Sequence, residues 1–132
     1  MLQMHFQGFG FASGLNGPNS SYLGEWESNL FHGYGIEMTD RGIYQGEFHK
    51  GLKKGLGKLV NEKGDYYYGE WSKNFENGIG INCLNTGYVY IGYHLKGKAN
   101  GFGEQRYKSG DKSQKYIGFF KQGKKHGFGL LH

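Results

Sequence analysis

Tyrosine, glycine and a second ring-bearing residue occupy alternate positions in five short segments of the 132-residue chain, and polar residues stand between them in the clearest copies. In the segment 44–48, Tyr44, Gly46 and Phe48 point to one face and Gln45 and Glu47 to the other, which is typical of a half-buried β-strand. Six residues, 49–54, separate this segment from the triplet Gly-x-Gly at 55–57. The pattern predicts a turn over these six residues and an antiparallel second strand at the triplet.

The same two-part pattern recurs along the chain. Its opening tyrosines are Tyr22, Tyr44, Tyr67, Tyr90 and Tyr116, so the period is about 23 residues. A fixed period in this range is the signature of a stacked repeat array. A single hairpin is marginal in water, so stability must come from pairing with neighbouring hairpins. We therefore predict an all-β protein: one elongated, single-layer antiparallel sheet of consecutive hairpins, an open solenoid-like array with about eleven strands.

We expect one domain over residues 1–132, with a partial repeat at 1–21 and full repeats starting at residues 22, 44, 67, 90 and 116. The segment Gly8-Phe9-Gly10-Phe11 reads as the second half of a repeat whose first strand is not found. Either that strand lies upstream of this sequence or something else supplies it.

Glycine and large aromatic residues dominate the composition. Most of the 26 glycines hold fixed places in the repeat, beside 11 Tyr, 10 Phe and 2 Trp. Such pairing indicates an ordered β-array in which backbone approaches something bulky. We expect the Tyr and Trp or Phe rings of each first strand to lie over the bare backbone of the Gly-x-Gly strand.

The fourth and fifth repeats depart from the pattern. Tyr93 and Phe119 replace the acidic residue of the first three repeats, and His94 stands where Trp or Phe is expected. These changes expose extra aromatic residues near the C-terminal end. The two interpretations are sequence drift and a docking surface.

No residue type in the chain forms a convincing catalytic site. His32 and His126 directly precede Gly-x-Gly, a place that other repeats fill with Lys or Asn, so we interpret them as turn residues. Glu25, Glu47 and Glu70 recur in register, and similar surroundings suit pairing with lysines or turn amides better than acid and base roles. We predict no catalytic residue, no cofactor, no metal site and no enzymatic activity.

Nucleotide-binding motifs are also missing from the sequence. The P-loop motif Gly-x-x-x-x-Gly-Lys-Ser/Thr does not occur. The Rossmann fingerprint is also missing, since no Gly-x-Gly opens a helix after a strand. Cys83, the one cysteine, has no internal disulfide partner, which favours a reducing compartment. No apolar run approaches the length of about 18 residues that a membrane helix needs. These features predict a soluble intracellular protein.

Lysines gather where each hairpin turns. The predicted basic rim consists of Lys50, Lys53, Lys54, Lys73, Lys96, Lys98, Lys121, Lys124 and Lys125. The net charge of the whole chain is +5. Such a rim could meet anionic lipid, acidic partner proteins or nucleic acid, or it could keep the turns solvated and block edge aggregation. Nucleic acid is the least favoured, because the rings that would stack on bases belong to the repeat core.

The phrase Tyr-x-Gly-Glu-Trp, a short turn and then His-Gly-x-Gly resembles the MORN repeat (membrane occupation and recognition nexus). The segments 22–26 with 32–35, and 67–71 with 77–80, match closely, and the resemblance covers residues 22–129. It implies an elongated sheet without catalysis of its own. Such proteins serve as scaffolds in cytoskeletal, ciliary and membrane-junction assemblies, or as modules beside enzyme domains.

Two hypotheses for function follow. In the first, the chain is a cytoplasmic scaffold of the cytoskeleton or cilium (axoneme), and an aromatic groove holds a partner's helix or extended segment. The groove residues would be Tyr22, Trp26, Tyr44, Phe48, Tyr67, Trp71, Tyr90, His94, Tyr116 and Phe120. In the second, the lysine rim tethers the chain to anionic phospholipid. A regulatory module of a larger enzyme is a further alternative.

Overall fold

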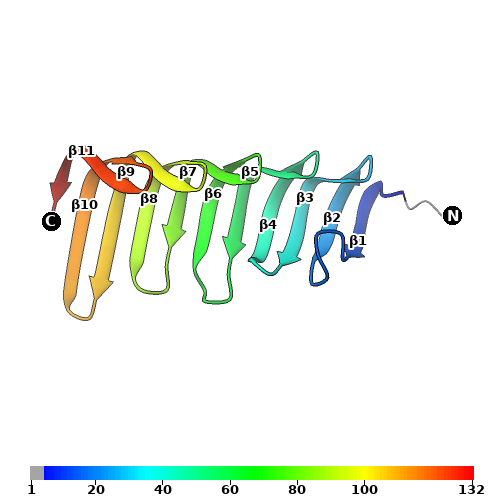
Figure 1. Ribbon diagram of the computed structural model, residues 1–132, viewed down its shortest axis with the longest axis horizontal. Helices are drawn as coiled ribbons and strands as arrows, with labels where there is room; N and C mark the ends of the chain where they lie inside the picture. Colours follow the sequence, from blue (N-terminus) through cyan, green and yellow to red (C-terminus); the bar gives the residue numbers. More distant parts are fainter. Residues whose placement is uncertain (1–4) are drawn as a thin grey trace.

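The computed structural model describes residues 5–132, and every regular element in this range is a β-strand. The strands are β1 (Gly8–Ser13), β2 (Ser21–Glu27), β3 (Leu30–Thr39), β4 (Gly42–His49), β5 (Leu52–Val60), β6 (Tyr66–Ser72), β7 (Phe75–Cys83), β8 (Tyr88–Leu95), β9 (Lys98–Ser109), β10 (Lys112–Lys121) and β11 (Lys124–Leu131). They form one 11-stranded sheet in chain order, which does not close into a barrel (Figure 1). The predicted all-β array of consecutive hairpins is confirmed.

The turns inside the repeats are tighter than the sequence predicted. Strand β4 ends at His49 and β5 begins at Leu52, so two residues make the turn instead of six. Lys50 and Gly51 have φ values of 48° and 82°, as in the type I′ turn that suits the twist of a hairpin. The expectation was wrong because Leu52 and Lys53 already pair with the first strand, opposite His49 and Phe48.

Each hairpin contains a wide irregularity next to its turn. Gly46 pairs with Gly57, but Phe48 pairs with Lys53, so the single residue Glu47 faces the segment 54–56. A bulge of this kind bends the strands and increases their twist. The same shift occurs in all five hairpins, and the ribbons curl at this edge of the sheet, the upper edge in Figure 1. The hairpin tips are therefore bent relative to the rest of the strands.

Bare glycine backbone and tyrosine rings fit together as predicted. A Cβ added to Gly57 would collide with the ring and hydroxyl of Tyr44. The Tyr44 hydroxyl donates a hydrogen bond of 2.9 Å to the carbonyl of Glu47, at the bulge. Equivalent bonds from Tyr22, Tyr67 and Tyr90 measure 2.6 to 2.8 Å. The tyrosine thus fills the space above the glycines and fixes the bend.

The rings also contact one another from repeat to repeat. Tyr44 meets Phe48 of its own repeat and Trp71 of the next at centroid distances of 5.0 and 5.2 Å, both edge to face. Edge-to-face pairs add about 0.5–1.5 kcal/mol each beyond their burial. The apolar core divides into two clusters, one from Tyr22 to Trp71 and one containing Tyr90, Tyr116 and Phe120. The buried ring of His94 joins them, 4.9 Å from Tyr67 and 5.0 Å from Tyr90.

Candidate functional site

The ten side chains predicted to line an open aromatic groove are all buried. None is more than 8% exposed, and they are Tyr22, Trp26, Tyr44, Phe48, Tyr67, Trp71, Tyr90, His94, Tyr116 and Phe120. Their rings pack against one another and against the glycines, so they form the core and leave little ring surface for a partner. The alternation showed that these residues share a face. It did not show that the bent tips bring other residues over them.

One residue from each bent tip lies over or beside the tyrosine of its own repeat. Phe31 stacks on Tyr22 at 3.8 Å between centroids, and the Lys53 ammonium lies 5.2 Å from the centre of the Tyr44 ring. We call the residues at this place in the five repeats the covering residues: Phe31, Lys53, Glu76, Ala99 and Lys125. Four residue types occupy this place, with lysine in the second and fifth repeats, whereas the tyrosines beneath them are constant.

The covering residues form one wall of a row of hollows along the aromatic side of the sheet, and we call this row the trough. Its floor is the row of tyrosines together with the residues paired between them on the second strands, which are Glu37, Leu59, Asn82, Gln105 and Leu131. Burial makes the hydroxyls of Tyr22 and Tyr67 in this floor harder to ionise. Burial raises the pKa of Tyr22 to about 12, and burial and then the Glu76 carboxylate raise the pKa of Tyr67 well above its ordinary range.

Lysine closes the trough at the second repeat. The Lys53 ammonium lies 3.3 Å from the Glu37 carboxylate, and both side chains are largely buried. Glu37 also accepts a hydrogen bond of 2.9 Å from the side-chain amide of Asn16. Because this ion pair is largely buried, removal of either partner would leave a buried charge uncompensated. The chain itself thus occupies this part of the trough.

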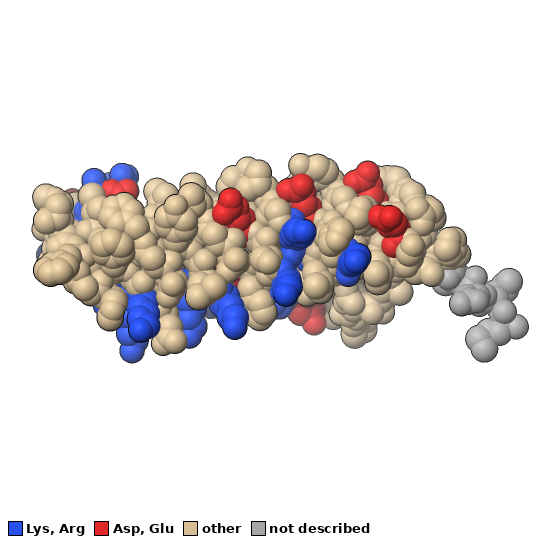
Figure 2. Space-filling view, turned by 90° about the horizontal axis from the view of Figure 1, so that it is seen from above, with Lys and Arg blue, Asp and Glu red and all other residues tan. Residues whose placement is uncertain are grey.

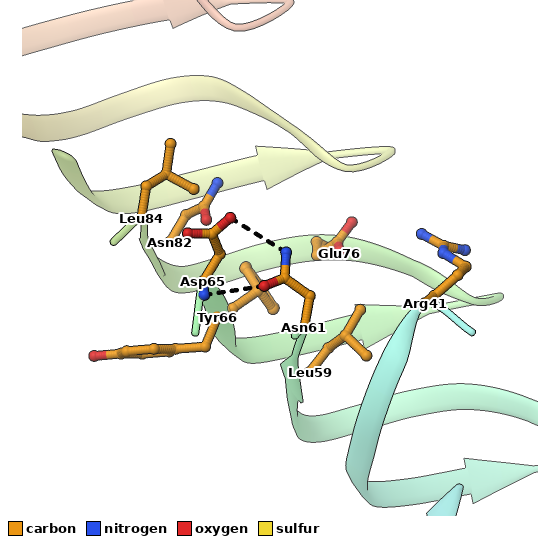
Figure 3. Close-up of a pocket in the computed structure, with 9 residues that line it drawn as sticks. Arg41, Leu59, Asn61, Asp65, Tyr66, Glu76, Asn82 and Leu84 are labelled. Carbon is orange, nitrogen blue, oxygen red and sulfur yellow. Dashed lines mark hydrogen bonds between the residues drawn. The ribbon is translucent and has the colours of Figure 1, made fainter. Parts of the chain in front are cut away.

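The trough opens into a hollow of about 370 Å³ at the third repeat. Its lining residues are Arg41, Leu59, Asn61, Asp65, Tyr66, Tyr67, Glu76, Asn82 and Leu84 (Figure 3). Hollows beside Tyr44 and Tyr116 measure only about 20 Å³ each. Around the tyrosine ring itself, the third repeat therefore offers more space than the second and fifth repeats, on which lysine covers the ring. A hollow of about 740 Å³ at the last two repeats is lined by Arg106, Lys108 and Lys115 and not by a tyrosine of the trough floor.

The turn at 61–65 holds one side of this hollow. The Asn61 carboxamide oxygen accepts hydrogen bonds from the amides of Lys63 and Asp65, at 2.9 and 3.1 Å. The Asp65 carboxylate accepts from the Asn85 amide at 2.8 Å and from the Asn61 side chain at 3.2 Å. These two bonds hold the pKa of Asp65 below its usual value, so the hollow contains at least one ionised carboxylate at neutral pH.

The family model of the MORN repeat matches five segments of the chain. They are residues 22–40, 44–66, 67–81, 90–112 and 116–132. The chain belongs to the MORN-repeat family. The segments begin at the residues where the sequence pattern placed the full repeats. Comparison with curated proteins gives no match.

The MORN repeat is a non-catalytic repeat module. Residues 5–132 contain no group of three or more His, Cys, Asp or Glu side chains placed to hold a metal ion. Cys83 is half-buried on the other face, paired with Tyr66 and Val89. In the same range no helix has the length and apolarity to cross a membrane.

The rim lysines of the MORN array lie at or beside the hairpin tips, as their sequence positions require. Lys53 is half-buried and turns inward over the Tyr44 ring, and the Lys125 ammonium lies 5.0 Å from the Tyr116 ring centre. Lys125 and the other seven lysines of the rim are exposed. Seen from the tip edge, acidic groups follow one side of the N-terminal half and basic groups the other (Figure 2). The rim is thus basic on one side only in this half.

The outer face, opposite the trough, carries an exposed apolar row that the sequence analysis did not single out. It consists of the central residues of the Gly-x-Gly triplets, which are Tyr34, Leu56, Ile79, Phe102 and Phe128, each at least 50% exposed. Alternation along the second strands could have revealed this row. No sequence signal could have revealed the covering residues, because the register shift at the bulge decides which tip residue faces the tyrosine.

Proposed function

We propose that this MORN array is a non-enzymatic scaffold that holds an extended segment of a partner protein in its trough. The observation that carries the proposal is the trough itself: a rigid tyrosine floor, a wall that changes chemistry from repeat to repeat, and a hollow of about 370 Å³. Concave sites with apolar floors and a few polar groups are the usual form of binding sites. A floor fixed by packing and hydrogen bonds also lowers the entropy cost of binding.

The spacing of the repeats favours an extended partner over a helix. Two neighbouring strands span about 9.6 Å across a sheet, so the trough repeats its chemistry at about that distance. An extended chain in the polyproline II conformation advances about 3.1 Å per residue and points every third side chain in the same direction, so every third residue would meet a new repeat. A helix advances about 1.5 Å per residue and would present an equivalent side chain out of step with this spacing.

Site-specific crosslinking tests the proposal directly. A photo-reactive phenylalanine analogue is placed at Asn82, on the trough floor, and in a matched variant at Leu56, on the outer face. We expect crosslinked partner from the Asn82 position and little from Leu56, in extracts of cells that contain the native protein. Crosslinks confined to Leu56 would place the partner on the other face and contradict the proposal.

Alanine substitution of the buried rings would be a poor test. Trp71 and Tyr90 are 4% and 1% exposed, and Phe or Trp to Ala changes in cores cost about 3–5 kcal/mol. A variant carrying both changes would lose its fold as well as its partner. Substitutions at covering residues avoid this problem, because four different residue types already occupy that place in the five repeats.

For the cellular setting we propose a cytoplasmic cytoskeletal or ciliary assembly, which rests on the family resemblance alone. Imaging of the fluorescently tagged protein in ciliated cells tests this part separately. Enrichment on the axoneme or cytoskeletal filaments is the expected result. A purely diffuse distribution would contradict the setting and leave the trough proposal standing.

Anionic lipid is the second candidate partner, favoured by the charge of the last two repeats. Residues 88–132 contain nine Lys or Arg and two Asp or Glu, a formal charge of +7. Each lysine near an anionic bilayer contributes about 1 kcal/mol. Flotation with phosphatidylserine vesicles at low and high salt separates the candidates. Salt-sensitive flotation, lost when Lys121, Lys124 and Lys125 become Gln, would support the lipid interaction.

A further inference from the structure

The repeats of this chain show what fits over a trough tyrosine. Phe31 stacks on Tyr22, and lysine ammonium groups lie 5.2 and 5.0 Å from the ring centres of Tyr44 and Tyr116. A cation over an aromatic face is attracted by the negative charge of the ring face. Two of the five tyrosines are thus covered by a cation that the chain supplies.

The third repeat has the ring but not the cation. Its covering residue is Glu76, and the space beside Tyr67 is the hollow of about 370 Å³. A water molecule takes about 30 Å³, so the hollow has room for a long side chain and several waters. Its floor contains Leu59, which suits the methylene groups of such a side chain.

The polar groups of the hollow suit a positive charge. Glu76 and Asp65 line it with carboxylates, and Asn82 adds a carboxamide (Figure 3). Across residues 5–132, neither carboxylate forms an ion pair within 4.0 Å. Arg41 is the one cation in the lining, at an exposed position in the turn between β3 and β4. It offsets part of the negative charge without covering the ring.

We propose that this hollow receives the side chain of a lysine or arginine carried by the partner segment, with the cation between the Glu76 carboxylate and the Tyr67 ring. The partner would thereby supply at the third repeat what Lys53 supplies at the second. This inference rests on the proposed function, because it needs a segment lying in the trough. It adds one specific requirement, a basic residue at the position that meets the third repeat.

Selection from a peptide library tests the requirement without knowledge of the natural partner. Random dodecapeptides displayed on phage are selected on the immobilised wild-type chain. Trough binders are the selected peptides that reduce crosslinking of the partner to the photo-reactive residue at Asn82. We expect Lys or Arg to be enriched at one position of these peptides. Replacing that residue by norleucine or Gln should weaken binding about tenfold.

Substitutions in the hollow then assign the effect to Glu76. Glu76→Lys gives the third repeat the covering residue of the second, so the variant should fold, and its own lysine should fill the hollow. We expect the affinity for the selected peptides to fall at least about tenfold. Glu62→Lys is the matched control, because it makes the same charge change at an exposed position of the 61–65 turn that does not line the hollow. Arg41→Gln should strengthen binding.

The outcomes separate this inference from the proposed function. Trough binders without an enriched basic residue, or with equal affinity for wild type and Glu76→Lys, would overturn the inference and leave the scaffold function intact. An equal loss of peptide affinity with Glu62→Lys would mean that added positive charge weakens binding wherever it is placed, and it would also overturn the inference. If no selected peptide competes at Asn82, both the inference and the trough function are contradicted.

Discussion

The first three full repeats and the last two share the same backbone bulge, but different side chains contact it. In the first three, a glutamate carboxylate accepts a hydrogen bond of 2.7 to 2.8 Å from the central amide of Gly-x-Gly, as Glu47 does from Leu56. In the last two, Tyr93 and Phe119 occupy that place, and both are exposed. The tyrosine hydroxyl bond to the bulge carbonyl exists in all five repeats. The ring is therefore the constant part of the bend, and the carboxylate is an addition.

The core and the charge change at the same boundary. The Trp71 indole donates a hydrogen bond of 2.9 Å to the carbonyl of Gly57, whereas the buried Nε2 of His94 lacks a hydrogen-bond partner among the described residues. Residues 1–87 carry seven basic and nine acidic residues, so all of the net positive charge lies in residues 88–132. The comparison indicates that the first three repeats favour stability, whereas the last two present an aromatic and basic surface.

The largest effect is expected from a side chain inserted between ring and backbone. Gly57→Val should lower the free energy of unfolding by about 3 kcal/mol or more, because the new Cβ collides with the Tyr44 ring in the middle of the array. Gly129→Val makes the same collision with Tyr116 on the last strand, where local fraying can relieve it. Urea unfolding followed by tryptophan fluorescence measures both variants. Equal, small changes in both would contradict the ring-and-glycine account of the core.

Acid should weaken the junction at His94. Burial lowers the pKa of His94 below its ordinary value of 6.5, so the unfolded chain takes up the proton first as the pH falls. This contribution to stability is complete above about pH 6.5 and is lost below it, by up to about 1.4 kcal/mol per pH unit.

Comparison of wild type with His94→Phe isolates this contribution, because Phe already holds the equivalent place at Phe48 and Phe120. Urea unfolding at pH 7.5 and 5.5 should show about 1 kcal/mol more acid loss in wild type. The remaining histidines are common to both proteins. A pH dependence that is identical in the two would show that His94 does not weaken the junction.

Removal of one bulge carboxylate should have a similar or slightly smaller effect. Glu47→Ala leaves the Leu56 amide without its acceptor, at a cost of about 1 kcal/mol for a hydrogen bond to a charged group near the surface. Glu62→Ala, at an exposed turn position, is the control for loss of an exposed carboxylate. Thermal unfolding compares them. A cost no larger than that of the control would mean that the carboxylate contributes little to the bend.

Periodicity determined most of the fold, because the strand faces and the order of hairpins follow from alternation and a fixed repeat length. The shared face of Tyr44 and Phe48 and the place of the glycines follow from the same pattern. The trough does not follow, since Lys53 covers Tyr44 only through the register shift at the bulge. Alternation shows only which face each residue of one strand takes. It does not show how many residues of that strand lie opposite a single residue of the neighbouring strand.

The smallest effect sharpens the comparison by converting the fourth repeat to the type of the first three. Tyr93→Glu places a carboxylate beside Gly101, where the Tyr93 side chain now lies, and within reach of the Phe102 amide. We expect a gain of about 0.5 kcal/mol, or about 2 °C in thermal unfolding, because one new hydrogen bond exceeds the loss of a half-exposed ring. Tyr93→Gln, which offers a neutral acceptor, should give less. A net loss with Glu would mean that Tyr93 packs well enough to stabilise its own bulge, and the two groups of repeats would then differ in surface alone.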